Sequence, residues 1–405
     1  MILEELSQQV TWEEFLTYRL RKGRFNWHEF EVADSFVSEM QYLPLVERMQ
    51  HGEGLSIPTK HLVNKMGSGK KRVVYSFQEE ENNVLKCMAY LLYRYDGQFS
   101  PNCYSFRRGL SAHDAVHHIL RAIDGRPMWA YKVDIHNYFN SISIPLLLPI
   151  LREMLAEDVP LYRFFEQILT DGRAIFKGKI IHEERGVMAG TPISPFLANV
   201  FLKEIDHFFA EIGGIYARYS DDIILFSPDF DELIKYKNTL SDFLQRYRLE
   251  VNPEKERIYR PDEAFDFLGF KCIGSEIDIS EATKRKMKDK IRRKTRSMLR
   301  WRTQKSISTD AAMKGLIKYF NRKFFERDDL QSLTWSRWFF PMINKTDGLK
   351  EIDHYLQENL RFLATGKHNK ANYRVSYSHL KELGYRSLVH EYYAFSKNLP
   401  TECNK

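Results

Sequence analysis

The sequence predicts an α+β fold, because short apolar runs with strand composition alternate with longer segments of helical periodicity. Residues 129–134 and 215–226 contain the clearest strand-like runs, and both include aspartate. From residue 284 onward the pattern is helical and strongly basic. The 405 residues are 43% hydrophobic, so we expect a substantial core and two or three subdomains.

Charge and cysteine content narrow the classes of partner and compartment. The formal net charge of +7 makes polyanions plausible partners. The four cysteines have no Cys-x-x-Cys spacing, which argues against a zinc site and a disulfide framework and fits a reducing cytoplasm. We expect no signal peptide and no membrane partner, because the N-terminus lacks a basic segment and no run of 18 apolar residues occurs.

Two adjacent aspartates, Asp221 and Asp222, lie between apolar runs. This order predicts a hairpin with its acids at the tip, and a solvated β-turn is the alternative for the pair taken alone. Adjacent carboxylates repel each other, and Mg²⁺ binds hard oxygen ligands of this kind. A two-metal phosphoryl-transfer site needs a further carboxylate from another strand, and Asp134 closes the apolar run at 129–134.

The Asp-Ile…Phe pattern at 134–139 and the Tyr-Ser-Asp-Asp sequence at 219–222 resemble the two metal-binding motifs of reverse transcriptases. The resemblance continues in order from about residue 55 to about residue 275. It implies a right-hand polymerase with fingers, a palm that contains an antiparallel sheet, and a helical thumb.

The same resemblance implies a division of the chain. Residues 1–54 would form an N-terminal helical extension and residues 55–130 the fingers. Residues 131–278 would form the palm, with a finger insertion at about 150–185. Residues 279–405 would form the basic helical thumb and the C-terminal helices.

The resemblance also implies the catalytic roles. A primer 3′-oxygen would attack the α-phosphate of a dNTP with two Mg²⁺ ions bound. Asp134 and Asp221 would bridge both ions, Asp222 would support them, and Ile135 would add a backbone carbonyl. Phe139 would exclude a ribose 2′-hydroxyl, although a plain core aromatic is the alternative for Phe139.

Further basic residues match segments that meet the nucleotide in this family. Lys70 and Arg72 follow a Gly-Ser-Gly turn in a basic hairpin that resembles the fingertip strands; an exposed basic hairpin is the alternative. Arg107 matches the arginine of the Tyr-Gly-Phe-Arg segment, in which Ser105 here replaces the usual Gly. Lys255 matches the lysine of the sixth motif.

Tyr219 and Gly269 are expected to lie at the primer, and Ala189 departs from the family pattern near the nucleotide. Tyr219 belongs to the Tyr-X-Asp-Asp box, and Gly269, in the apolar run 265–271, resembles the primer grip. We expect Gly269 inside a strand where another backbone approaches closely, with a β-bulge as the alternative. Ala189 stands where many members of the family carry Gln, so one side-chain contact near the nucleotide is absent.

Residues 284–302 contain eleven Lys or Arg against one Asp. A helix of one charge sign repels itself, so this segment predicts a polyanionic partner. We expect Arg292, Arg293 and Arg296 to contact primer or template.

The resemblance therefore implies an RNA-directed DNA polymerase whose product is an RNA/DNA or DNA duplex. The Met-Ala-Gly-Thr-Pro-Ile-Ser-Pro sequence at 188–195 resembles that of the defence-associated "unknown group" reverse transcriptases. This resemblance implies a dedicated structured non-coding RNA template and a role against phage. A group II intron-like or retron-like reverse transcriptase remains an alternative. A palm-fold nucleotide cyclase and a catalytically inactive RNA-binding relative are alternatives from other classes.

Overall fold

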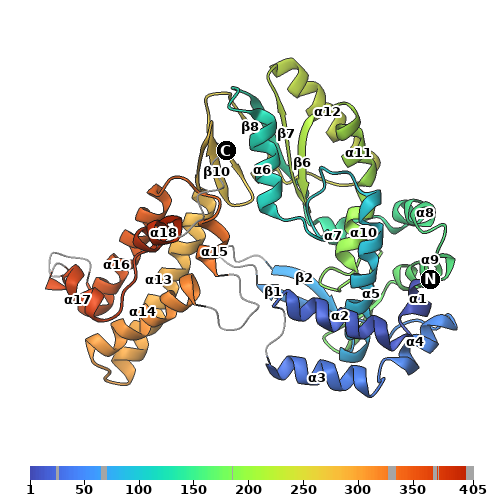
Figure 1. The fold of residues 1–405 in the computed structure, drawn as a ribbon, viewed down its shortest axis with the longest axis horizontal. Coiled ribbons are helices and arrows are strands. Elements are labelled where there is room, and N and C mark those ends of the chain that lie inside the picture. Colours follow the sequence, from blue (N-terminus) through green and yellow to red (C-terminus); the bar gives the residue numbers. More distant parts are fainter. Residues whose placement is uncertain are drawn as a thin grey trace. The chain divides into compact units, whose positions relative to one another are not determined.

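The structure is a computed structural model that describes residues 1–23, 27–64, 71–184, 186–326, 334–367, 372 and 374–397. The chain divides into two compact units, Met1–Glu263 and Ala264–Lys405 (Figure 1). Helices and largely antiparallel sheets occur together, which confirms the predicted α+β class. No helix within the described ranges is both long enough and apolar enough to cross a membrane.

The first unit is mostly helical around two sheets. Its helices are α1 (Ile2–Glu5), α2 (Gln9–Arg21), α3 (Trp27–Ser38), α4 (Leu43–Gln50), α5 (Glu79–Leu91), η1 (Leu92–Gln98), α6 (Ala112–Ile123), α7 (Tyr138–Ser141), α8 (Ile144–Met154), α9 (Val159–Thr170), α10 (Ser194–Phe201), α11 (Lys203–Glu211), α12 (Phe230–Arg246) and η2 (Pro253–Lys255).

The sheet that carries the aspartates has the strand order β6-β7-β3-β8, with every neighbouring pair antiparallel. Its strands are β3 (Trp129–Asp134), β6 (Ile215–Tyr219), β7 (Asp222–Ser227) and β8 (Arg257–Tyr259). Consecutive residues of β7 are buried, and side chains alternate between faces, so both faces of this strand are covered. Helices α6 and α11 pack against β6, and α12 packs against β7 and β3.

A second sheet in this unit has the order β2-β1-β4-β5. Its strands are β1 (Thr59–Asn64), β2 (Lys71–Ser76), β4 (Arg173–Phe176) and β5 (Lys179–His182). Strands β1 and β2 pair antiparallel in continuous register, as the sequence predicts for the basic hairpin. Residues 65–70, between these strands, lie outside the described residues.

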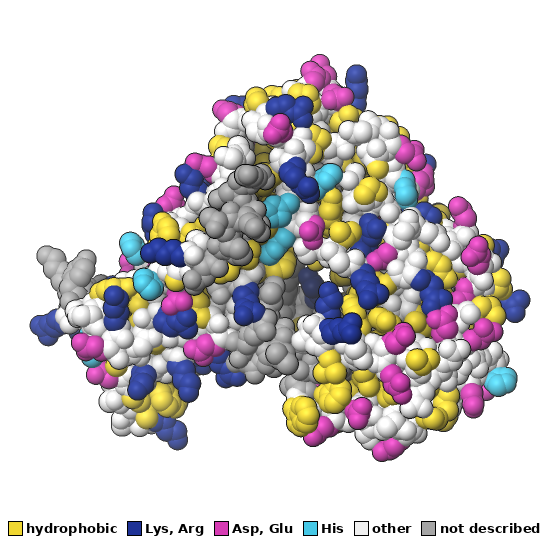
Figure 2. All heavy atoms as spheres, in the orientation of Figure 1, with side chains coloured by type: hydrophobic (Ala, Val, Ile, Leu, Met, Phe, Trp, Pro, Cys, Tyr) yellow, Lys and Arg dark blue, Asp and Glu magenta, His cyan; other side chains and the backbone are white. Residues whose placement is uncertain are grey.

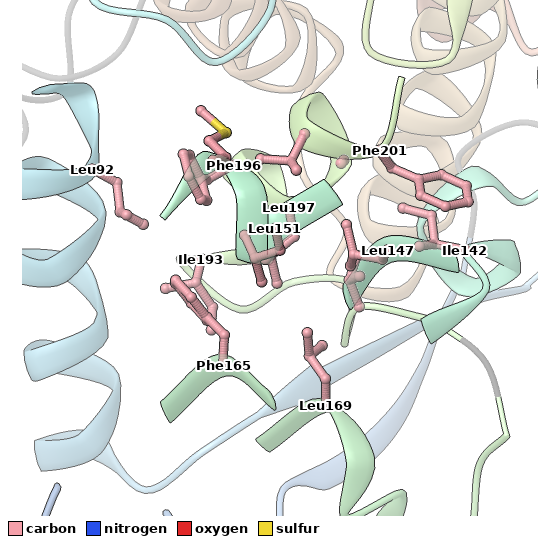
Figure 3. Close-up of a cluster of buried hydrophobic side chains, with 14 of the residues drawn as sticks. Leu92, Ile142, Leu147, Leu151, Phe165, Leu169, Ile193, Phe196, Leu197 and Phe201 are labelled. Atoms are coloured by element: carbon pink, nitrogen blue, oxygen red, sulfur yellow. The ribbon is translucent and has the colours of Figure 1, made fainter. Parts of the chain in front are cut away.

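Part of the hydrophobic core of the first unit lies where α8, α9 and α10 meet (Figure 3). Leu147, Leu151, Phe165, Leu197 and Phe201 are fully buried there. These residues recur at helical spacing along their own segments, so each helix presents one apolar stripe to its neighbours. This packing holds α8, which follows α7 and the Asp134 strand β3 in the chain.

The second unit places one small sheet beside a set of helices. The sheet has the order β11-β10-β9 and comprises β9 (Phe265–Phe267), β10 (Phe270–Ile273) and β11 (Glu276–Ile279). Its helices are α13 (Glu281–Gln304), α14 (Thr309–Phe325), α15 (Trp335–Phe339), α16 (Asp347–Thr365), α17 (Tyr377–Glu382) and α18 (Leu388–Lys397). Helix α13 contains the whole predicted basic segment, and Ser280 caps it by accepting a hydrogen bond from Thr283 N.

Candidate active site

Three aspartates from two neighbouring strands come together at one end of the β6-β7-β3-β8 sheet. Asp134, the last residue of β3, lies directly opposite Asp222, the first residue of β7. The backbone N–H of Ile135 donates to the carbonyl of Asp221 at 3.0 Å. The antiparallel register therefore brings the predicted third carboxylate beside the Asp-Asp pair.

A tight turn presents Asp221. Tyr219 pairs with Asp222 across the hairpin, which leaves Ser220 and Asp221 as the connection. Ser220 has a φ of +62°, in the left-handed region that costs a non-glycine residue about 1 kcal/mol or more. Backbone strain of this kind persists only where surrounding contacts hold it in place, and it is common at functional sites.

The carboxylates repel one another, and two lysines offset this repulsion. Burial, together with the negative charges of Asp134 and Asp222, raises the pKa of Asp221 to about 6. Lys255 pairs with the Oδ2 atom of Asp134, and the Lys132 Nζ atom lies 3.8 Å from the Asp222 Oδ1 atom. The charge of Lys255 acts in the opposite direction on Asp221 and lowers its pKa.

The donor chemistry suits a magnesium ion. Among the described residues, no group of three or more His, Cys, Asp or Glu side chains is arranged to hold a metal ion. The three aspartates nevertheless form an electrostatically coupled set, because both Asp134 and Asp222 raise the pKa of Asp221. Carboxylate oxygens are ligands that Mg²⁺ prefers, so a cation bound here would stabilise the ionised cluster and compete with Lys255 for Asp134.

Three neighbouring aromatic rings include that of Tyr219, the residue that pairs with Asp222 across the hairpin. Phe139, in α7, is half-buried, and its ring centroid lies 6.0 Å from that of Phe106 in an edge-to-face arrangement. Phe106 also lies 6.5 Å from the ring of Tyr219. Sequence reasoning missed Phe106, although it directly precedes Arg107 in the segment already singled out. These ring contacts follow from the conformation of the loop, in which Phe106 has a φ of +57° and a side chain that is 39% exposed.

The predicted phosphate ligands of the basic hairpin are placed only in part. Lys70 lies outside the described residues, whereas Arg72 is an exposed residue of β2 opposite Val63. The Ala189 carbonyl accepts a hydrogen bond from Tyr75 N at 2.7 Å, so the predicted loop packs onto β2. Ala189 itself is buried, and it makes this contact through its backbone. The expected loss of a Gln side-chain contact near the nucleotide stays a prediction.

Arg107 is held by the backbone of its own region. Its guanidinium donates to the carbonyls of Asp96, Ser100 and Cys103 at 2.8, 2.6 and 3.0 Å. These bonds fold the loop that carries Phe106. The contact of Arg107 with a nucleotide stays a prediction.

Gly269 differs from its expected local structure. It lies with Leu268 in the turn between β9 and β10, and not inside a strand. Its φ of +94° favours glycine, and a Cβ atom there would lie 3.2 Å from Thr283 Oγ1. The close neighbour is thus the start of α13, because the Gly269 carbonyl accepts bonds from Ser280 N and Thr283 Oγ1. A role for Gly269 at a primer stays a prediction.

Some cations of the basic helix α13 pair with acidic side chains, and six of its cations are exposed, with Arg292 in both groups. Lys284 and Lys288 both pair with Glu351 of α16, and Arg292 pairs with Asp289 at 2.7 Å. The exposed cations of this helix are Arg285, Lys286, Arg292, Arg293, Arg296 and Arg300. The face drawn in Figure 2 shows Lys and Arg side chains spread over the helices of this unit, with acidic side chains among them.

Lys290 occupies an unfavourable position on the same helix. The pKa of Lys290 is lowered to about 8, most strongly by burial and further by the nearby ammonium of Lys323 in α14 and by Arg293. Like charges held this close favour an anion between or beside them. This three-residue arrangement could not be predicted from the sequence, because Lys323 belongs to the next helix.

Comparisons with known proteins give the chain its family. Among curated proteins, the retron Mx65 reverse transcriptase of Myxococcus xanthus is 22% identical over 262 residues, which cover 62% of this chain and 58% of that protein. Protein YkfC of Escherichia coli (strain K12) is 22% identical over 220 residues, covering 44% of this chain and 57% of YkfC. The chain thus spans less than two thirds of the length of these relatives.

A solved structure of apo telomerase from Candida tropicalis aligns with 84% of this chain and 62% of its own, at 12% identity and a TM-score of 0.49. The sequence model of the family described as "Reverse transcriptase (RNA-dependent DNA polymerase)" matches residues 63–272. This range is just over half of the chain, and it includes both aspartate segments. The chain therefore belongs to the reverse transcriptase family.

Proposed function

We propose that this chain is an RNA-directed DNA polymerase. The observation that carries the proposal is the convergence of Asp134, Asp221 and Asp222 at the end of an antiparallel sheet, with the pKa of Asp221 raised by burial and by its two neighbours. Carboxylates gathered in this way are suited to phosphoryl transfer with divalent cations. The family of the chain supports the same reaction.

In the proposed reaction, the primer 3′-oxygen forms a bond to the α-phosphorus of a dNTP as the bond to pyrophosphate breaks. Bound Mg²⁺ would lower the pKa of the attacking hydroxyl and stabilise the leaving group. Asp134 and Asp221, with Asp222 in support and the Ile135 carbonyl alongside, would hold the ions. Lys255 would move from Asp134 to neutralise phosphate charge.

The substrate-binding roles rest on the same resemblance to the motifs of the family. Phe139, held edge-on by Phe106, would lie against the sugar and exclude a 2′-hydroxyl. Lys70, Arg72 and Arg107 would meet the triphosphate, whereas Tyr219 and Gly269 would lie at the primer. We assign residues 55–130 to fingers, 131–278 to palm and 279–405 to thumb, in which the exposed arginines of α13 would follow a nucleic-acid backbone.

A primer-extension assay tests the proposal. Purified protein should incorporate dNTPs on a primed RNA template in the presence of Mg²⁺. Asp221→Asn with Asp222→Asn should abolish incorporation but retain RNA binding, because these changes remove charge without changing side-chain shape. Incorporation by the double variant at the parent rate would remove this site from the reaction. No incorporation by the parent on any primed template would favour the inactive RNA-binding relative.

We further propose that the template is a dedicated structured RNA and that the product acts against phage. The sequence at 188–195 resembles that of the defence-associated group, and the similarity to a retron reverse transcriptase keeps the retron-like alternative open. Sequencing of the nucleic acid that co-purifies with the protein would distinguish one dominant structured RNA from a mixed population. Phage plaquing on cells with the parent or the Asp221→Asn chain tests the defence role.

A further inference from the structure

A buried polar cluster lies directly behind the Ser220–Asp221 turn. Arg218 and Asp206 are both fully buried, and they form an ion pair in which Arg218 Nε donates to Asp206 Oδ1 at 2.8 Å. Tyr216 Oη donates to the same carboxylate oxygen at 2.7 Å. Buried charges are retained only when they are paired and hydrogen-bonded, and this pair meets that requirement.

The cluster holds both polar backbone atoms of the strained residue. Arg218 Nη1 donates to the carbonyl of Ser220 at 3.2 Å. The backbone N–H of Ser220 donates to Ser105 Oγ at 2.8 Å. The left-handed conformation of Ser220 is therefore fixed from two sides by residues outside the turn.

Ser105 and Arg218 are joined through a third residue. Asn199, which is buried in α10, accepts from Ser105 Oγ at 3.2 Å and from Arg218 Nη1 at 3.3 Å through its Oδ1 atom. Asn199 Nδ2 returns a bond to the Ser105 carbonyl at 2.7 Å. The network thus links the 102–106 segment, α10 and the end of β6.

The segment that carries Ser105 is itself fastened to β6. Arg218 N donates to the Asn102 carbonyl at 2.9 Å, and Tyr104 N donates to the Arg218 carbonyl at 3.0 Å. Cys103 forms a parallel bridge with Arg218. Ser105 is therefore presented to the turn from a backbone that pairs with the same strand, which leaves its hydroxyl little freedom.

We propose that Ser105 and Arg218 are positioning residues, which hold the Ser220–Asp221 peptide so that the Asp221 carboxylate faces Asp134 and Asp222. This inference rests on the proposed function, because it assigns the turn a role in phosphoryl transfer. Rotation of that peptide would redirect the carboxylate without unfolding the hairpin, since the β6-β7 ladder ends at Tyr219 and Asp222. Mutual repulsion of the aspartates favours such a rotation when the tethers are removed.

The matched test compares two buried serines of similar local chemistry. Ser105 accepts from the N–H of Ser220, and Ser227, at the opposite end of β7, accepts from Asp229 N at 3.0 Å. Ser105→Ala should speed hydrogen–deuterium exchange of peptides that cover residues 216–222 by about tenfold in the RNA-free protein, the scale expected for one lost hydrogen bond. Ser227→Ala should leave exchange in those peptides unchanged.

Kinetics give the second readout. Ser105→Ala should lower kcat for dNTP incorporation by about tenfold with the KM for dNTP within about twofold, because the tether acts on the reacting geometry and not on nucleotide binding. Ser105→Thr, which keeps a hydroxyl, should recover most of the rate. Arg218→Lys should reproduce the loss, because a single ammonium near Asp206 cannot also reach the Ser220 carbonyl.

Parent-like exchange and kcat in Ser105→Ala would overturn the inference, as would an equal loss in Ser227→Ala. If Ser105→Ala does not fold, Arg218→Lys alone decides the question: a lower kcat supports the inference, and a parent-like kcat overturns it. A parent protein without polymerase activity would refute the proposed function, whereas the exchange measurement would still report whether Ser105 holds the turn.

Discussion

Lys255 forms an ion pair with Asp134, and its Nζ atom donates to the carboxylate oxygen Oδ2. The Asp134 side chain is only 6% exposed, whereas that of Lys255 is 44% exposed. The lysine therefore reaches from the protein surface into the carboxylate cluster and supplies a counter-charge there. The same ammonium lowers the pKa of Asp221, so it influences a second aspartate that it does not bond.

Lys255→Gln should move the acid limb of the pH–rate profile to higher pH. Without the lysine charge, the pKa of Asp221 rises further above about 6, and a larger fraction of the carboxylate is protonated at any given pH below neutrality. Single-turnover primer extension from about pH 5 to about pH 8, which runs from about one unit below to about two units above this pKa, measures the shift. Lys235→Gln, an exposed lysine of α12, is the control; an unmoved acid limb in Lys255→Gln would contradict the expectation.

Asp221→Asn should stabilise the metal-free protein. Because the folded-state pKa of Asp221 is raised to about 6, the ionised carboxylate opposes folding by about 3 kcal/mol above that pH. The stability associated with the protonated form is fully present below the unfolded-state pKa and is lost as the pH rises through about 6. Thermal unfolding in EDTA should therefore show a higher midpoint for the variant at pH 8 and little difference near pH 4.

The control for this stability measurement is Asp242→Asn, at an exposed position of the same unit. It should change the midpoint little at either pH. A midpoint of Asp221→Asn equal to that of the parent at pH 8 would mean that burial and the neighbouring aspartates do not destabilise the ionised Asp221 carboxylate in solution.

Phe139→Ala should relax sugar selection. Removal of the ring opens the space that a ribose 2′-hydroxyl would occupy, so the ratio of rNTP to dNTP incorporation should rise by at least about tenfold. Phe208→Ala provides a matched control, because both phenylalanines are partly buried against the same core. A ratio that does not change would assign Phe139 to the core alone.

The exposed cations of α13 should determine the salt dependence of nucleic-acid binding. Replacement of Arg292, Arg293 and Arg296 with Gln should reduce the slope of log affinity against log salt by about two to three, at about 0.7–0.9 per phosphate contact. Saturating template should then restore much of the rate. Lys284→Gln with Lys288→Gln is the control on the same helix, since Glu281 pairs with Lys284 and Glu351 pairs with both lysines within the protein.

If the triple variant binds normally and loses activity only at the chemical step, the thumb assignment is wrong. A parent protein with little salt dependence would contradict the polyanion interpretation of α13.

Lys290 should make nucleic-acid binding depend on pH near 8. Its pKa of about 8 in the free protein would rise beside a phosphate, so binding should take up a proton and weaken as the pH increases from 7 to 9. Lys290→Met should remove this dependence. Lys286→Met, an exposed lysine one turn earlier, should retain it; equal pH dependence in both variants would separate Lys290 from the binding surface.

The sequence by itself predicted the local elements that carry the candidate chemistry. Apolar runs next to aspartate at 129–134 and 215–226 predicted β3 and the β6-β7 hairpin, because strand formation there follows from composition and short-range pattern. The helical pattern of the basic segment 284–302 predicted α13 in the same way. The ordered motifs predicted the reverse transcriptase family, which the match over residues 63–272 bears out.

Only the tertiary structure decided which side chains meet. Lys255 bonds Asp134 across 121 positions of sequence, and Ser105 bonds Ser220 across 115. The turn at Gly269 replaced the predicted strand because its φ and its contact with Thr283 depend on how α13 follows the sheet. Such contacts arise from strand register and helix packing, and no periodicity along the chain encodes the distance between residues so far apart.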